Sequence, residues 1–260
     1  MAAFMFAASF LEWLSVTHFV RGTAELTYFV DALGGSLLIA AFSWVLYVAL
    51  EPYVRRRWPQ SLISWTRLLG GNLRDPLVAG HVLIGLAQGV ALSLALVSLQ
   101  LFGPPSLLVD QAGVNILSGA GGAAAYALLT IQASVIFTLG SLFLFFLLRL
   151  LVRRNLPAAL LFAALLAAQN LASPQAALFV PVNFAVDLVV VWLLIRFGVL
   201  PLLAAQVPSA VTSYPITSDF SAWHGGIALF ALGTVVVVAL WSFRVALGGR
   251  ALFKDEFLDR

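Results

Sequence analysis

The side chains with the clearest potential for chemistry are histidines that stand where apolar segments begin. Of the three histidines in the sequence, His81 opens the run "HVLIGLAQGVALSLALVSLQL" and His224 opens "HGGIALFALGTVVVVALWSF". A neutral imidazole can bind a haem iron or the magnesium of a chlorophyll-type pigment. The simpler interpretation is a polar ring at a membrane edge that makes one hydrogen bond. His81 and His224 are therefore candidate pigment ligands, with a hydrogen-bonded histidine as the alternative at each position.

A carboxylate and an amide lie inside another apolar run. Asn183 and Asp187 belong to "AALFVPVNFAVDLVVVWLLI", and their spacing of four places them on one face of a helix. We expect that face to point into the bundle, because a carboxylate toward lipid is costly. A proton or ion relay is the functional interpretation, although transporters usually show two related halves with broken helices and no second half is visible. The alternative is a structural carboxylate bonded to Gln132, Gln169 or Asn170.

The composition indicates that these residues belong to a membrane protein. Hydrophobic residues make up 62% of the 260 residues and charged residues 10%, with a mean hydropathy of +1.03; soluble domains carry about 25% charged residues. Lipid offers the backbone no hydrogen bonds, which leaves helices or a closed barrel. Barrel strands alternate apolar and polar residues, whereas "SLFLFFLLRLLV" is apolar nearly all round. We therefore predict an all-α polytopic transmembrane helical bundle, with residues 1–260 forming a single integral membrane domain.

Other classes of site are excluded by composition. The sequence has no cysteine, so it can form neither disulfides nor thiolate metal sites. The isoelectric point near 9.7 reflects arginines at the ends of apolar runs. We expect no nucleic-acid partner, because no basic surface interleaved with aromatic residues is available to hold one.

Apolar runs of about 20 residues, the length that crosses a bilayer, locate the predicted helices. Residues 156–211 are the difficult part, since they hold two runs (156–170 and 176–195) and then a segment that Pro201 and Pro208 interrupt. That last segment is either a further crossing or a broken, re-entrant piece. The total is about eight crossings, or six if the difficult region crosses once. The remaining predicted helices are Ala2–His18, which contains Glu12, and Leu33–Leu50, Gly80–Leu101, Ala124–Leu148 and His224–Phe243.

Basic residues set the expected orientation. Thirteen of the fourteen Lys and Arg residues share one side if this side holds Leu50–Asp75, Arg149–Asn155, Arg196 and the tail after Phe243; the other side keeps Arg21. Short cytoplasmic loops are enriched in Lys and Arg, so the basic side, with both termini, is predicted to be cytoplasmic. Eight crossings keep Arg196 out of the hydrocarbon, where it would cost about 2.5–3.5 kcal/mol. In this topology His81 and His224 lie near opposite sides, so they cannot share one metal ion.

The first basic loop has the features of a membrane anchor. Arg55, Arg56, Arg57 and Trp58 follow an apolar run and are expected to lie among lipid headgroups. This interpretation is favoured over a specific lipid or phosphate site.

The same loop continues into a predicted amphipathic helix over Ser61–Leu69 that lies in the membrane plane. Leu62, Trp65 and Leu69 share one face of it, while Ser64 and Arg67 fall on the opposite face. Trp65 and Arg67 are thus further predicted lipid contacts.

Small residues form a stripe along the next apolar run. Gly85, Gly89 and Ser93 recur every four residues, which places them on one helix face. Such stripes let two membrane helices approach closely. We predict a tight helix contact here.

Two long motifs carry a family resemblance. The stretch "YVALEPYVRRRWPQSLISWTRLLGGNLRDPLV" and the C-terminal "YPITSDFSAWHGGIALFALGTVVVVALWSFRVALGGRALF" resemble the membrane domain that follows the catalytic domain in bacterial, notably acidobacterial, serine/threonine protein kinases. Between them "IRFGVLPLL" is a weaker match, and the resemblance spans most of the chain from about Glu25 onward. It implies a multi-pass protein of the bacterial inner membrane, with the cytoplasmic side as derived above.

The sequence also departs from that family. The Gly-rich loop, strand lysine, H-R-D and D-F-G motifs that phosphoryl transfer needs are not found, and we expect no catalytic domain and no enzymatic activity. "DPLVAGH" stands where Gly-Arg-Asp usually follows "DPLV", so His81 replaces an acidic residue; in "SAWHGG", His224 replaces a tyrosine.

These observations predict a non-catalytic membrane scaffold or interaction subunit derived from a kinase-type membrane domain. We expect it to be an accessory subunit of a larger photosynthetic or respiratory membrane complex, with other integral membrane subunits and lipids as partners. A chlorophyll-type pigment or a lipid is the cofactor that its histidines and aromatic faces would suit. The alternatives are a membrane sensor module of a signalling system and a small transporter that uses Asp187.

Overall fold

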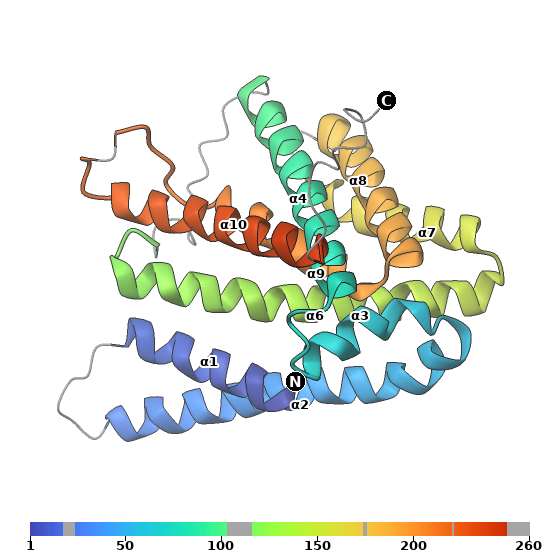
Figure 1. Ribbon diagram of the computed structural model, residues 1–260, viewed down its shortest axis with the longest axis horizontal. Helices are drawn as coiled ribbons and strands as arrows, with labels where there is room; N and C mark the ends of the chain where they lie inside the picture. The colour runs from blue at the N-terminus through green and yellow to red at the C-terminus, as the bar shows by residue number, and fades with distance from the viewer. Residues whose placement is uncertain (18–23, 103–115, 174–175, 220, 249–260) are drawn as a thin grey trace, which may run out of the picture.

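A computed structural model of the chain describes residues 1–17, 24–102, 116–173, 176–219 and 221–248. Every regular element in these ranges is a helix, which confirms the predicted all-α class (Figure 1). In chain order the elements are α1 (Ala2–Val16), α2 (Ala24–Arg57), α3 (Gln60–Leu69), α4 (Pro76–Phe102), α6 (Ala120–Val152), α7 (Asn155–Ala167), the short 3-10 helix η1 (Ala168–Asn170), α8 (Ala176–Arg196), α9 (Val199–Val211) and α10 (Gly225–Ala246).

Five of the described helices are long and apolar enough to cross a membrane, namely α2, α4, α6, α8 and α10. The chain is therefore a membrane protein with transmembrane helices. Three further apolar helices are shorter: α1, α7 with η1, and α9. The predicted total of about eight crossings requires all three of these short helices to cross as well.

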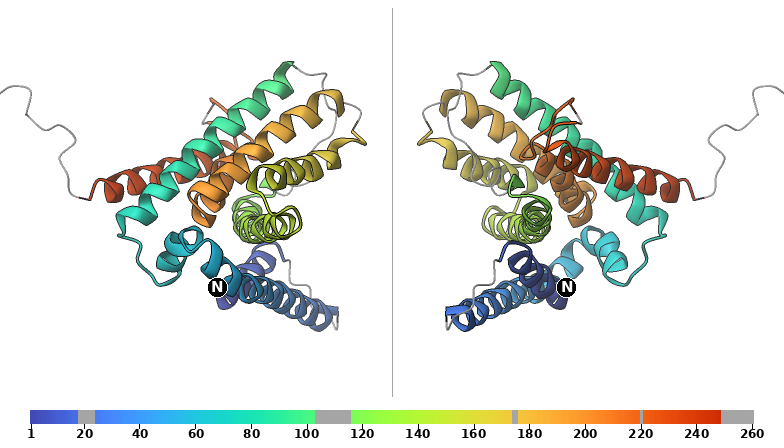
Figure 2. Two further views of the ribbon diagram at one scale, coloured as in Figure 1. Left: turned by 90° about the vertical axis from the view of Figure 1, so that its right-hand side faces the viewer. Right: turned by 90° about the vertical axis from the view of Figure 1, so that its left-hand side faces the viewer.

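The helices run in two directions. In Figure 1, α1, α2 and α6 lie along the long axis of the molecule, while α4 and α8 cross them steeply. Figure 2 agrees, because α2 and α6 are seen nearly end-on there while α4 and α8 run obliquely. α9 lies in the middle and packs against α3, α4, α6, α8 and α10. A short helix at this position is surrounded by other helices rather than by lipid.

α9 is a continuous helix of 13 residues despite its prolines. Pro201 falls in the first turn, where the missing N–H would have no partner in any case. Gly198 precedes the helix with a φ of 89°, a left-handed conformation that suits glycine and lets the chain turn sharply between α8 and α9. A Cβ at Gly198 would also collide with the backbone of Ser61 in α3. The predicted break at Pro201 and Pro208 is therefore absent from α9, which at 13 residues is one of the shorter apolar helices.

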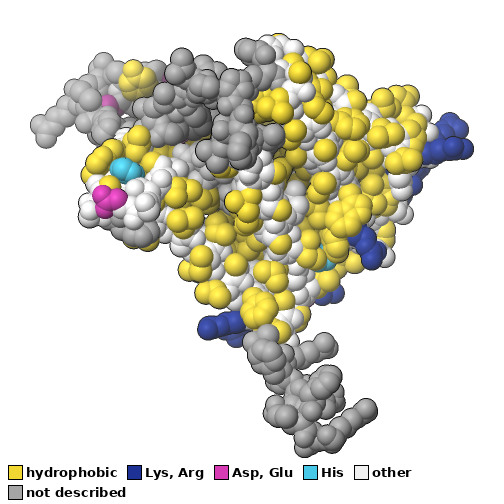
Figure 3. Space-filling model, turned by 90° about the horizontal axis from the view of Figure 1, so that it is seen from above, with side chains coloured by type: hydrophobic (Ala, Val, Ile, Leu, Met, Phe, Trp, Pro, Cys, Tyr) yellow, Lys and Arg dark blue, Asp and Glu magenta, His cyan; other side chains and the backbone are white. Residues whose placement is uncertain are grey.

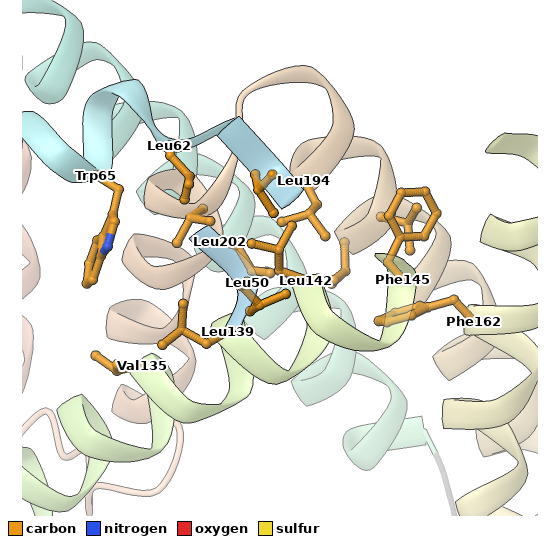
Figure 4. Packing of buried hydrophobic residues seen from close by; sticks show 14 of the residues in the cluster. Leu50, Leu62, Trp65, Val135, Leu139, Leu142, Phe145, Phe162, Leu194 and Leu202 are labelled. Atoms are coloured by element: carbon orange, nitrogen blue, oxygen red, sulfur yellow. The ribbon is translucent and has the colours of Figure 1, made fainter. Parts of the chain in front are cut away.

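The main core lies around the second half of α6 (Figure 4). Phe145 of α6 and Phe162 of α7 meet there edge to face, with ring centroids 6.5 Å apart. Membrane helices gain little from excluding water, so close packing of this kind is what holds them together. The labelled side chains come from six helices: Leu50 from α2, Leu62 and Trp65 from α3, Val135, Leu139, Leu142 and Phe145 from α6, Phe162 from α7, Leu194 from α8 and Leu202 from α9.

α3 forms where the amphipathic helix was predicted, but its buried face is different. Leu62 and Trp65 are buried as expected, whereas Leu69 is 44% exposed and Ser64, predicted to face outward, is fully buried. The reason is that α3 packs against α2, α4, α8 and α9. α3 therefore buries the face that contacts these helices, and not only a face suited to lipid. Its small serine side chains let the neighbouring helices approach closely.

Candidate functional site

The two longest helices end beside each other, and both ends carry arginine. Arg55, Arg56 and Arg57 occupy the last turn of α2, and Arg149 lies in the last turn of α6. Arg153 caps α6 in a left-handed conformation, with a φ of 61°. Figure 3 shows basic side chains along the right and lower margins of one face, which is otherwise mostly hydrophobic. Positive charge thus gathers at the C-terminal ends of these two helices, where the helix dipole favours it.

Trp58, a predicted headgroup anchor, also joins α2 to α6. The guanidinium of Arg149 lies over its ring, 4.4 Å from the centroid. Phe145 stacks on the same indole at a centroid distance of 5.7 Å. A cation held over an aromatic face loses freedom of movement, so Trp58 fixes the position of Arg149.

An open hollow of about 570 Å³ lies between these helix ends and is lined by Arg57, Arg149, Leu150 and Arg153. The ion pairs of the described chain lie elsewhere: Arg55 pairs with Glu51 and Arg67 pairs with Asp75, both at 2.6 Å. The three lining arginines therefore have no acidic partner among the residues described. Guanidinium groups arranged in this way can bind an anion such as phosphate.

The junction between α3 and α4 is held by one carboxylate. Asp75 accepts a hydrogen bond of 2.8 Å from the backbone N–H of Leu77 and one of 2.6 Å from Nη1 of Arg67. The Leu77 N–H and the Arg67 guanidinium hold the pKa of Asp75 below its usual value. Arg67, predicted to contact lipid, is thus engaged by protein.

His81 lies in the first turns of α4, half-buried beside α3. Its Nδ1 and the hydroxyl of Ser64 form a hydrogen bond of 2.9 Å, and its ring meets Phe197 edge to face at 5.9 Å. His81 thus makes the hydrogen bond of the simpler interpretation, while its Nε2 takes no part in that bond. The bond fixes the orientation of the ring and occupies Nδ1.

His224 immediately precedes α10 and lies against Trp223, with ring centroids 5.2 Å apart. Its Nδ1 is buried and has no hydrogen-bond partner among the described residues. α10 begins at the left edge of Figure 1, while α4 begins near α3, so the two histidines lie far apart. Neither the remaining His18 nor Arg21 belongs to the described residues, and the same holds for Arg250, Lys254 and Arg260.

The intramembrane polar residues are paired differently from the prediction. Gln132 of α6, one predicted partner of Asp187, is buried and instead donates from Nε2 to Oε2 of Glu12 in α1, at 2.8 Å. Asp187 and Asn183 are both partly buried in α8 and make no hydrogen bond or ion pair with the described residues. The Glu12–Gln132 pair was missed, although each residue is a polar group in an apolar run and so needs a partner.

Arg196 ends α8, where its guanidinium lies 5.9 Å from the ring centroid of Phe197. It is exposed at the helix end.

The small-residue stripe of α4 faces α9, and this is the most extensive helix contact in the described chain. A Cβ at Gly85 would collide with the carbonyl oxygen of Pro201 and lie 2.8 Å from Cβ of Ala204. A Cβ at Gly89 would meet the backbone of Ala205. Ser93 continues the stripe, with a buried hydroxyl that has no partner among the described residues.

Two further hollows flank α9. One, of about 420 Å³, lies between α6 and α9 and includes the polar side chains of Tyr126, Thr130 and Gln206. The other, of about 250 Å³, reaches α10 and is mainly apolar, with Phe230 and Val238 in its wall.

No family model, curated protein or solved structure matches this chain. Within the described ranges, no group of three or more His, Asp or Glu side chains could hold a metal ion. The features that remain for function are the arginine hollow and the unpaired polar face of α8.

Proposed function

We propose that the chain is an integral membrane subunit that binds partner helices within the bilayer and has no catalytic activity. In this proposal it derives from a kinase-type membrane domain and serves as an accessory subunit of a larger membrane complex, with lipids at its remaining surface. The observation that carries the proposal is the unpaired carboxylate of Asp187.

Asp187 is near the middle of α8. The helix has 21 residues, or about 31 Å at 1.5 Å per residue, which matches the hydrocarbon thickness. A charged residue at the centre of a membrane helix costs about 2.5–3.5 kcal/mol on insertion scales. Since Asp187 and Asn183 have no partner in the described chain, we infer that another helix supplies one.

The surroundings of Asp187 fit a helix partner. α8 packs mainly on α7, with a smaller contact to α9. Val189, Trp192 and Ile195 are exposed along α8, but at about 3.6 residues per turn they lie on a different face from Asp187. The partner helix therefore contacts α8 along Val180, Asn183 and Asp187, which share one face and are partly exposed. The charge of Asp187 favours a partner helix with a Lys or Arg at the same depth, because such pairing offsets the cost of the carboxylate.

A transporter that uses Asp187 is the second candidate, because an unpaired intramembrane acid is also what a proton relay requires. However, Asp187 lines none of the three hollows described above. None of these three hollows therefore gives Asp187 an aqueous path.

The proposed subunit crosses the inner membrane of a bacterium about eight times, with both termini in the cytoplasm. α9 supports this count, because it begins beside α3, where Gly198 meets Ser61, and the chain after it reaches the start of α6. There the hydroxyl of Tyr214 donates to the carbonyl oxygen of Ala123 at 3.1 Å. Burial raises the pKa of Tyr214 to about 12, so the hydroxyl keeps the proton that it donates.

The test is the size of the particle that contains this chain. After gentle solubilisation of native membranes, the wild type is expected in an assembly well above the 27.9 kDa of the chain alone. Asp187→Leu should release the chain from it, while Glu25→Gln, which removes an acid in the first turn of α2, should not. Asp187→Leu should leave the chain folded, because leucine suits the middle of a membrane helix.

A wild-type chain that runs as a monomer would refute the proposal. An Asp187→Leu variant that stays in the assembly would refute the role given to this residue. Ion or proton flux through wild-type proteoliposomes that Asp187→Leu abolishes would establish the transporter instead.

A further inference from the structure

The hollow between the ends of α2 and α6 supports an inference about lipid binding. We propose that Arg57, Arg149 and Arg153 bind the phosphate of an anionic lipid headgroup. This deepens the lipid contact of the proposed function, but it does not rest on Asp187, which lies on a different helix.

The first argument is electrostatic. The arginines come from the ends of two helices, Arg57 from α2 and Arg149 and Arg153 from α6. Arg57 and Arg149 are close enough for their charges to repel each other. No acidic side chain of the described residues neutralises them, whereas the neighbouring Arg55 has its own acid in Glu51. A bound phosphate would remove this repulsion and accept charge-assisted hydrogen bonds from the guanidinium groups.

The second argument is that the site is held in place by its surroundings. Trp58 fixes the guanidinium of Arg149 from one side, at 4.4 Å. Arg153 lies at the turn between α6 and α7, where its positive φ reverses the chain direction. A group of arginines that only marked the cytoplasmic side would need neither feature, because exposed arginines serve that purpose in any arrangement.

The third argument separates a lipid from a free phosphate ion. Leu150 lines the hollow and is exposed, and Leu147 and Phe143 are exposed at the preceding positions of the same face of α6. These residues, spaced at three and four, form an apolar strip that leads away from the arginines along the helix. A charged hollow continued by an apolar strip matches a phosphate headgroup continued by acyl chains.

The test compares lipids on the purified full-length chain in detergent. Added phosphatidylglycerol should raise the melting temperature more than phosphatidylcholine does, because only the first carries a net negative charge. In a binding titration, Arg153→Gln and Arg57→Gln should each weaken phosphatidylglycerol binding about tenfold, as expected for the loss of one charge-assisted hydrogen bond. Arg244→Gln is the matched control, since it removes the same charge from an exposed position on α10 outside the hollow.

Arg153 is the safer of these sites for substitution, because it is exposed and does not contact Trp58. Equal effects of the two lipids would overturn the proposal, and so would an equal loss of binding in Arg244→Gln. Inorganic phosphate that stabilises the chain as well as phosphatidylglycerol does would overturn the assignment to a lipid. Asp187→Leu should bind phosphatidylglycerol like the wild type, which separates a failure here from a failure of the proposed function.

Discussion

At the scale of single residues, two glycines determine how closely α4 and α9 approach. A side chain at Gly85 or Gly89 would overlap the backbone of α9, whereas a Cβ at Gly80, also in α4, would meet nothing within 4 Å. Glycine itself weakens a helix by about 0.5–1 kcal/mol relative to alanine. The close contact therefore outweighs that cost at Gly85 and Gly89.

We expect Gly85→Ala and Gly89→Ala each to destabilise the protein by about 1–3 kcal/mol, since the added methyl group forces the helices apart. Gly80→Ala should be neutral or stabilising because its Cβ is free of contacts. Thermal unfolding in one detergent compares the three variants. Equal melting temperatures for all three would mean that α4 and α9 are not in close contact.

At the scale of elements, α3 shows what a periodic pattern leaves undetermined. Leu62 and Leu69 share the apolar face that periodicity predicts, but in the structure only Leu62 is buried. Leu62→Ala should therefore cost about 2–5 kcal/mol, the range for buried leucine. Leu69→Ala should change stability by less than about 0.5 kcal/mol, as for most surface positions. Unfolding of both variants in detergent tests this difference, and equal losses would restore the face predicted from the sequence.

Every apolar run predicted from the sequence is a helix in the described chain, because hydropathy alone identifies segments that suit hydrocarbon. Their bounds were harder: α2 covers Ala24–Arg57 rather than Leu33–Leu50, since a helix continues into the headgroup region where polar residues no longer disrupt it. Partners between helices could not be predicted. Ser64 binds His81, and Gln132 binds Glu12, through contacts that depend on which helix faces meet. The arginine hollow forms because α6 lies beside α2, and no pattern within a single segment predicts which helices become neighbours.

At the scale of the whole molecule, the unequal distribution of charge predicts orientation. The natural sequence has no cysteine, so single cysteines report without background. Ser218→Cys, at an exposed position between α9 and α10, should react with an impermeant maleimide added outside intact cells. Arg56→Cys, exposed at the end of α2, should react only after the membrane is opened. The opposite pattern would reverse the orientation, and labelling of both positions from outside would contradict the eight-crossing count.

The hydrogen bond between Glu12 and Gln132 joins residues 120 positions apart, which has a consequence for biosynthesis. A ribosome that adds about 5–20 residues per second makes Gln132 roughly 6–24 s after Glu12. During that interval α1 has been translated and its carboxylate has no amide to bind it, so entry into hydrocarbon is costly. α1 therefore reaches its final place against α6 only once α6 has emerged.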